Sequence, residues 1–141
     1  MHAYEIFDLE GLRVAEDGVT PRTRSARSRT LLGLFFIQAG VNHFVMPGPY
    51  RRIVPPGIGD PATLVKISGA AEVLGGVGVF VPAARRLSGI GLIALLAAVF
   101  PANLHMARNP EKFHKIPRGL LYARLPLQPL AMVWVWRATG R

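Results

Sequence analysis

The 141-residue sequence contains no cysteine, which excludes a disulfide, a thiol redox pair and a metal site built from thiolates. Acidic residues are few, eight Asp and Glu against seventeen Lys and Arg, and they form no carboxylate-rich metal site. No Ser-His-Asp triad and no phosphate-binding loop is found. Charged residues make up only 18% of the chain, while half of its residues are hydrophobic. This balance is unusual for a soluble domain of this length and indicates one small membrane domain.

Four apolar segments follow one another, at residues 30–46, 62–82, 87–106 and 119–136. At ~1.5 Å per residue, the second segment spans roughly the hydrocarbon thickness of a bilayer. We therefore predict an all-α fold, a four-transmembrane-helix bundle. Five prolines within residues 47–61 exclude a continuing helix and predict a stiff, ordered connection. Pro101 predicts a kink in the third helix, and Pro126 and Pro129 could break the fourth.

The remaining residues form two tails. Residues 1–29 are predicted to be a polar, disordered N-terminal tail, residues 30–136 the membrane domain, and residues 137–141 a C-terminal tail. The net charge of +9 arises from short basic clusters between the apolar segments, a pattern typical of topology signals, so we expect no nucleic-acid partner. Eight basic residues flank the side that holds the termini and six flank the other. A multi-pass protein of the cytoplasmic (plasma) membrane with cytoplasmic termini is predicted.

Small residues spaced by four predict where the helices pack. Helices in lipid associate through close approach of their backbones, which favours glycine and alanine at the contact. Ala94, Ala98 and Ala102 form such a stripe on the third helix, and Ala71 and Gly75 form one on the second. We expect these stripes to hold a compact bundle together.

Polar side chains from all four predicted helices fall in the half of the membrane that faces the proline-rich connection, because successive helices run in opposite directions. They are Asn42, His43, Lys66, Glu72, Asn103, His105 and Arg124. Glu72 stands in the middle of an uncharged, glycine-rich helix. An ionised acid in that setting costs a few kcal/mol, so it needs a partner, a proton or a function.

Two interpretations of this group stay open. In the first, Glu72 forms a structural ion pair with Arg124 or Lys66, as polar residues in membrane bundles often do. In the second, the group lines a site for a quinone headgroup or another small ligand. The ligand-facing candidates are then Glu72, His43, Asn42, Asn103 and His105. A haem held by His43 and His105 is the least favoured reading, because two histidines are a minimal signal for haem. No metal site is predicted, and no residue can be given a catalytic role.

A string of motifs along residues 30–136 resembles the DoxX family of small bacterial membrane proteins. The string consists of Asn42-His43-Phe44 with Pro47 and Tyr50, Ile53-Val54-Pro55, Ser68-Gly69 with Glu72 and Gly75-Gly76-Val77-Gly78, Pro82, Arg85-Arg86, and Phe100-Pro101-Ala102-Asn103 with Met106. The resemblance implies a four-helix integral membrane protein. Its matching motif positions include His43, Pro55, Glu72 and Asn103.

The resemblance also bears on function. The DoxX family takes its name from a small subunit of an archaeal thiosulfate:quinone oxidoreductase, and distant animal relatives look like assembly chaperones. Members linked to thiol redox chemistry rely on cysteines, which this chain lacks. We therefore predict an accessory or quinone-proximal subunit of a membrane redox system, without catalysis by the isolated chain, in contact with the lipid bilayer and a redox-enzyme subunit. The alternative is a non-catalytic membrane scaffold or assembly factor.

Overall fold

The computed structural model describes residues 21–140, and every regular element within them is helical. The elements in chain order are α1 (Pro21–Val45), α2 (Pro47–Ile53), α3 (Pro61–Phe80), α4 (Arg85–Arg108), the 3-10 helix η2 (Pro110–Phe113) and α5 (Arg118–Thr139). The prediction of an all-α fold is therefore confirmed for this part of the chain.

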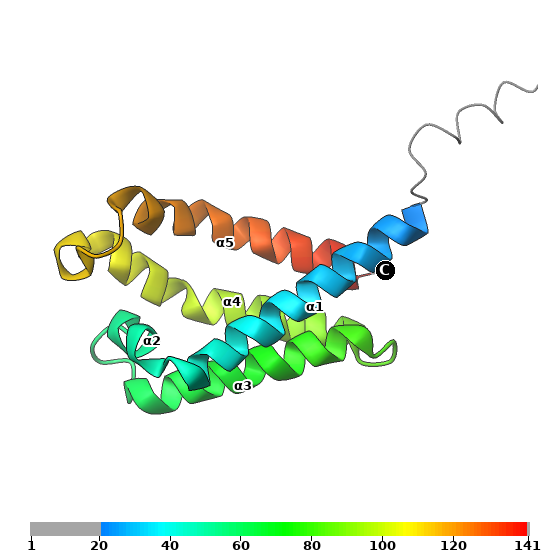
Figure 1. Cartoon of the computed structure of the whole chain (residues 1–141), viewed down its shortest axis with the longest axis horizontal. Coiled ribbons are helices and arrows are strands. Elements are labelled where there is room, and N and C mark those ends of the chain that lie inside the picture. The colour runs from blue at the N-terminus through cyan, green and yellow to red at the C-terminus, as the bar shows by residue number, and fades with distance from the viewer. Residues whose placement is uncertain (1–20, 141) are drawn as a thin grey trace, which may run out of the picture.

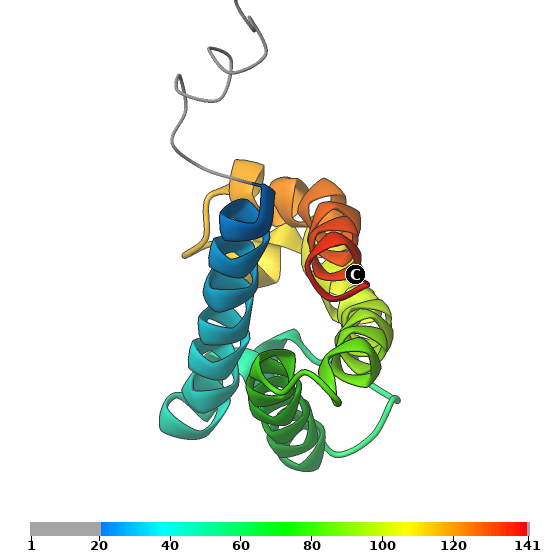
Figure 2. The same ribbon diagram turned by 90° about the vertical axis from the view of Figure 1, so that its right-hand side faces the viewer.

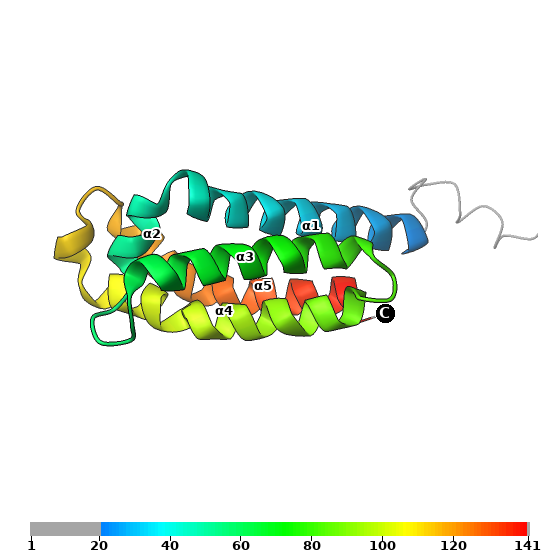
Figure 3. The same ribbon diagram turned by 90° about the horizontal axis from the view of Figure 1, so that it is seen from below.

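The four long helices α1, α3, α4 and α5 lie roughly along one direction and alternate in sense (Figure 1). Viewed from one end they surround a common centre, in the order α1, α3, α4, α5 (Figure 2). The short helix α2 lies at one end of this bundle, next to the start of α3 (Figure 3). The start of α1, the α3–α4 turn and the end of α5 lie at the other end (Figure 1).

Helix α1 begins earlier than the sequence predicts. Residues 21–29, expected in the disordered tail, belong to this helix, while residues 1–20 of that tail lie outside the described residues. Pro21 suits a first helical position. The added turns are held by tertiary contact, since the Trp134 indole N–H donates to the Ser28 hydroxyl over 2.9 Å. A contact between residues so far apart in the chain is invisible to local sequence patterns.

The proline-rich connection is partly helical. The prolines end α1 as predicted, but Pro47 then occupies the first turn of a new helix, where its missing N–H costs nothing. The axis turns by 94° between α1 and α2 at this break. The sequence predicts an ordered connection but not its helix, because the same proline that ends one helix is well suited to begin another.

Helices α1 and α3 pack through glycine on both sides. A Cβ atom built on Gly40 would lie 2.5 Å from the carbonyl oxygen of Gly69, and one built on Gly76 would lie 2.7 Å from that of Gly33. Real Cβ atoms essentially never approach this closely, so the two backbones meet only because these positions are glycine. We call Gly33, Gly40, Gly69 and Gly76 the glycine seam.

The alanine stripe predicted on the third helix does not form such a contact. Ala94 is exposed, and Ala98 and Ala102 line a cavity. Gly75 does serve packing, since a Cβ there would lie 2.5 Å from the Leu92 side chain of α4. The expectation for the alanines is wrong because periodicity cannot say which side of a helix meets a neighbour.

Two helices, α3 and α4, are long and apolar enough to cross a membrane, and the bent pair of α1 and α2 would make a third span. Large apolar side chains also point outward from the bundle, for example Leu74 at 72% and Leu87 at 73% exposure. Apolar surface of this extent is unfavourable in water and suits a lipid environment. The buried core on the inside is correspondingly small and consists of two clusters. One contains Leu32, Phe36, Val79, Leu92, Val135 and Ala138, and the other contains Met106, Phe113 and Leu121.

Asp60 caps the N-terminus of α3. Its carboxylate accepts hydrogen bonds from the Thr63 hydroxyl (2.7 Å) and the Thr63 backbone N–H (2.8 Å). These two hydrogen bonds hold the pKa of Asp60 below its ordinary value of 3.8, and the bond from the Thr63 hydroxyl has the larger effect. The cap therefore stabilises the fold fully at pH values above the pKa that Asp60 has in the unfolded chain. This stabilisation is lost as the pH falls through the pKa of Asp60 in the folded protein.

We expect Asp60→Ala to lower the thermal midpoint at neutral pH and to have little effect in strong acid, where the cap is already lost. Circular dichroism melts of the detergent-solubilised protein at both pH values measure this. Asp60→Asn, which keeps an accepting oxygen, is the control and should melt close to the parent protein at neutral pH. An equal loss from Asp60→Ala at both pH values would contradict the cap.

Candidate functional site

A cavity of about 570 Å³ lies among all five α-helices, in the half of the bundle that holds α2. Its wall is mostly apolar. Seven polar or charged side chains reach it, and they are His43, Tyr50, Ser68, Glu72, Asn103, Arg124 and Gln128. A mainly apolar pocket with a few converging polar groups is the usual form of a small-molecule site.

Glu72 and His43 meet at one wall of the cavity. The Glu72 Oε2 lies 3.4 Å from the His43 Nδ1. That nitrogen lies closer, at 2.8 Å, to the carbonyl oxygen of Ala39. Because a carbonyl only accepts, Nδ1 carries a hydrogen and directs it to Ala39. The buried Glu72 Oε2 consequently has no hydrogen-bond donor within the described residues.

Tyr50 of α2 fixes the imidazole of His43 from outside the helix. The two rings are stacked, with centroids 3.9 Å apart and planes 25° from parallel. The turn at Met46 places α2 so that its tyrosine reaches back over the end of α1. The ring of His43 is therefore held between its own helix and α2, and His43 is buried.

Gln128 and Asn103 bridge α5 and α4 at another wall. The Asn103 amide donates to the Gln128 Oε1 over 2.9 Å, and the Gln128 amide donates to the carbonyl oxygen of Leu96. Gln128 is 5% exposed, so this pair is satisfied inside the bundle. The two amides are structural bridges that also border the cavity.

Arg124 lies on α5 and lines the cavity, and no acidic side chain among residues 21–140 pairs with it. Its Nη1 points at the Met106 sulfur, 3.7 Å away, a weak acceptor. The predicted ion pair of Glu72 with Arg124 or Lys66 is not formed, since the one basic side chain of the described residues that reaches the Glu72 carboxylate is His43. Lys66 is exposed and lies outside the cavity wall. It occupies a different face of α3 from Glu72, because six residues correspond to about 600° of helix rotation.

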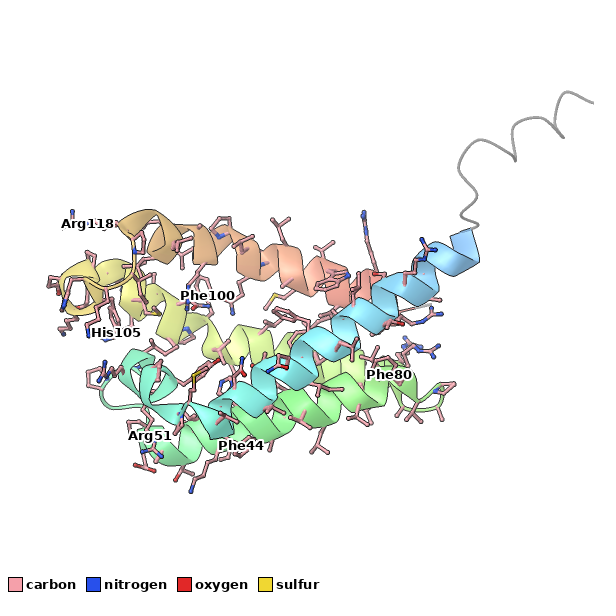
Figure 4. All side chains as sticks on the ribbon, in the orientation of Figure 1. Phe44, Arg51, Phe80, Phe100, His105 and Arg118 are labelled. Carbon is pink, nitrogen blue, oxygen red and sulfur yellow. The ribbon has the colours of Figure 1, made fainter. Side chains whose placement is uncertain are left out.

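Two other predicted residues lie away from the cavity. Asn42 accepts a hydrogen bond from exposed Gln38 on the outer face of α1. His105 lies near the end of α4, beside η2 (Figure 4), where Asn109 bonds its ring and backbone. His43 and His105 therefore do not face one site, which removes the arrangement on which a bis-histidine haem would depend.

The site thus brings together Glu72, His43, Asn103 and Arg124 of the predicted residues, together with Ser68. Tyr50 and Gln128 were not predicted as site residues. The signal for Gln128 is visible in the sequence, since it is a lone amide in an apolar helix between two prolines. Tyr50 carries no comparable signal, because its place depends on the turn before α2.

The chemistry available here is recognition by hydrogen bonds. Among residues 21–140 there is no group of three or more His, Asp or Glu side chains able to hold a metal ion. One wall offers the unsatisfied acceptor of Glu72, and another offers the guanidinium donors of Arg124. A ligand with oxygen substituents on two sides and an apolar body fits these walls.

The fold and the cavity define an all-helical protein of membrane character with an internal ligand-sized space. Residues 31–139 match the model of a family described as a domain of unknown function (DUF8561). The chain belongs to the DUF8561 family. No curated protein and no solved structure matches it. The family description names no activity, so the resemblance to DoxX proteins stays a prediction.

Proposed function

We propose that this chain is a four-helix integral membrane protein of the DoxX type that binds a quinone-type headgroup in its cavity. The observation that carries the proposal is the buried Glu72 Oε2, an acceptor to which no group of residues 21–140 donates, at the wall of a mainly apolar cavity. A buried acceptor left unsatisfied costs about 1–3 kcal/mol. A hydroxyl group on a ligand would supply the missing donor.

Glu72 and Arg124, the carboxyl and guanidinium groups of the cavity wall, suit such a ring. Glu72 on α3 and Arg124 on α5 belong to helices that are not neighbours in the bundle. A quinone-type ring carries oxygen substituents on opposite sides, as carbonyl or hydroxyl groups. The Glu72 acceptor on one wall and the Arg124 donors on the other match the two ring oxygens. The cavity volume of about 570 Å³ also falls in the range usual for small-molecule sites.

The isolated chain is proposed to be accessory rather than catalytic. A bound quinone would supply electron and proton chemistry, whereas the chain's own residues hold the ring oxygens and exclude water. An electron donor would have to be another subunit of a membrane redox system. The resemblance to the DoxX family supports this role.

The fourth span is proposed to be α5. Its outward face carries exposed apolar side chains such as Leu130 (62%) and Val133 (50%), while Pro126, Pro129 and Arg124 lower its apolar content. Four spans would place the start of α1 and the end of α5 on one side, as their common position at one end of the bundle allows (Figure 1). The basic flanks, eight against six, favour the cytoplasm for that side and the cytoplasmic membrane as the location.

The test is binding of a soluble, short-tailed quinone analogue to the purified protein in detergent or nanodiscs, measured by calorimetry. Ala102→Phe puts a ring into the cavity and should weaken binding about tenfold or more. Ala94→Phe on the same helix is the control, because Ala94 is exposed and lies outside the cavity wall, and it should bind like the parent protein. No saturable binding to the parent protein, in oxidised or reduced form, would overturn the proposal and favour a scaffold or assembly factor whose polar groups only stabilise the bundle.

A further inference from the structure

Helices α1 and α5 touch only along part of their length. The Ser28 hydroxyl meets the Trp134 indole, and the rings of Phe35 and Trp134 lie 6.1 Å apart. Beyond this point α1 follows α3 along the glycine seam, where Gly40 meets Gly69. In Figure 1, α1 accordingly crosses the bundle from the end of α5 towards the start of α3.

Exposed residues of α1 and α5 line the cavity along this edge. Phe35 of α1 and Leu127 of α5 both line the cavity, and they are 56% and 57% exposed. Each side chain therefore has one side towards the cavity and the other towards the surroundings. Both are apolar, and both lie in helices that the proposed function places in the membrane. The mouth between them would open to lipid.

The opposite edge of the cavity, between α3 and α4, carries additional chain. Pro55 and Ile58, from the connection that follows α2, line the cavity together with Ile67 of α3. Figure 3 shows this connection passing beside the adjoining ends of α3 and α4. Ile67 is 59% exposed, about as much as Phe35 and Leu127. The α3–α4 edge therefore differs from the α1–α5 edge mainly because the connection after α2 covers it.

We infer that the ligand is a membrane-dissolved molecule with a long apolar tail, which enters and leaves between α1 and α5 and leaves its tail in that gap. The inference rests on the proposed function and adds the path and the class of ligand to it. The headgroup lies at Glu72, and the tail passes between Phe35 and Leu127 into lipid. A ligand without a tail would fill the polar part of the cavity only.

Paired analogues with the same headgroup, one with and one without a prenyl tail, test the path. The tail should strengthen binding to the parent protein. Leu127→Trp should reduce that gain about tenfold, where the gain is the ratio of the affinities of the tailed and tailless analogues for the same variant, so that any effect of the new ring on headgroup binding cancels. Ile67→Trp is the matched control, since Ile67 is as exposed and lines the same cavity at the other edge. The proposed path would be overturned if Ile67→Trp also lost the affinity gained from the tail, or if the tail did not strengthen binding to the parent protein. Failure of the tailless analogue to bind the parent protein would overturn the proposed function instead.

A fluorescence measurement gives a second readout that needs no change at the mouth. The chain has two tryptophans, so Trp136→Phe leaves Trp134, which contacts Phe35 at this edge, as the sole reporter. A brominated tail should quench Trp134 saturably, and an unbrominated tail should compete this quenching away. Bound ligand without such quenching would place the tail elsewhere and overturn the inference.

Discussion

Gly40→Leu should lower the free energy of unfolding by about 3 kcal/mol, the upper end of the usual cost of overpacking. A side chain at this position meets the backbone of α3, since its Cβ would lie 2.5 Å from the Gly69 carbonyl oxygen and 2.9 Å from the Val73 nitrogen. Backbone atoms within a helix cannot turn aside as a flexible side chain can. Helices α1 and α3 would have to separate, which gives up their contact along the whole seam. Unfolding by titration with sodium dodecyl sulfate in mixed micelles measures the loss.

Gly91→Leu is the matched control for this prediction. Gly91 is also a helical glycine, but it is exposed, and no atom of the described residues lies within 4 Å of a Cβ built there. Its substitution should leave stability unchanged or raise it slightly, because glycine is a poor helix former. Equal destabilisation by both variants would show that glycine matters here for something other than close approach. Gly40→Ala and Gly69→Ala should in turn combine non-additively, since both obstruct the same contact.

Glu72→Gln should weaken binding of a hydroxyl-bearing quinol analogue about tenfold. The amide oxygen still accepts a hydrogen bond, so the loss is the difference between a bond to a carboxylate, about 1.5–3 kcal/mol, and a bond to a neutral acceptor, about 0.5–1.5 kcal/mol. Stability should be unchanged or higher, because a neutral amide costs less to bury than a carboxylate to which none of the described residues donates. Calorimetric titration and a thermal melt of the same preparation provide the two measurements.

Lys66→Gln serves as the control for Glu72→Gln. It removes a charge from the same helix, but at an exposed position away from the cavity wall. Its affinity for the analogue should equal that of the parent protein. The opposite pattern for Glu72→Gln, a lower melting temperature with unchanged affinity, would show that the contact of Glu72 with His43 serves the fold and not a ligand.

The helices themselves follow from local sequence. Their apolar segments, the prolines that end α1 and the cap at Asp60 are all readable within a few residues. The gathering of polar residues at one end follows from alternating helix direction, which four successive helices with short connections impose. The first turns of α1 and the existence of α2 are not readable in this way, because the former depend on Trp134 and the latter on the turn at Met46.

Which residues belong to the site depends on how each helix is rotated about its axis. Asn42 and His43 are adjacent in the sequence, yet one lies outside and the other lines the cavity, since neighbours on a helix point about 100° apart. Asn103 and His105 differ by two residues, or about 200°, and only Asn103 lines the cavity. The sequence places each pair at one depth but cannot orient it.

The sequence by itself determined that this chain is helical and membrane-like and that its one central acid lies in the same half of the bundle as His43, His105 and Arg124. These properties depend on composition and order, which act locally. The tertiary structure alone decided that Glu72 meets His43 rather than Arg124, that glycines rather than alanines join the closest helices, and that a cavity remains at the end near α2. The physical reason is that the rotation of each helix about its axis is set by how its neighbours pack, and Gly33, Gly40, Gly69 and Gly76 fix that rotation for α1 and α3.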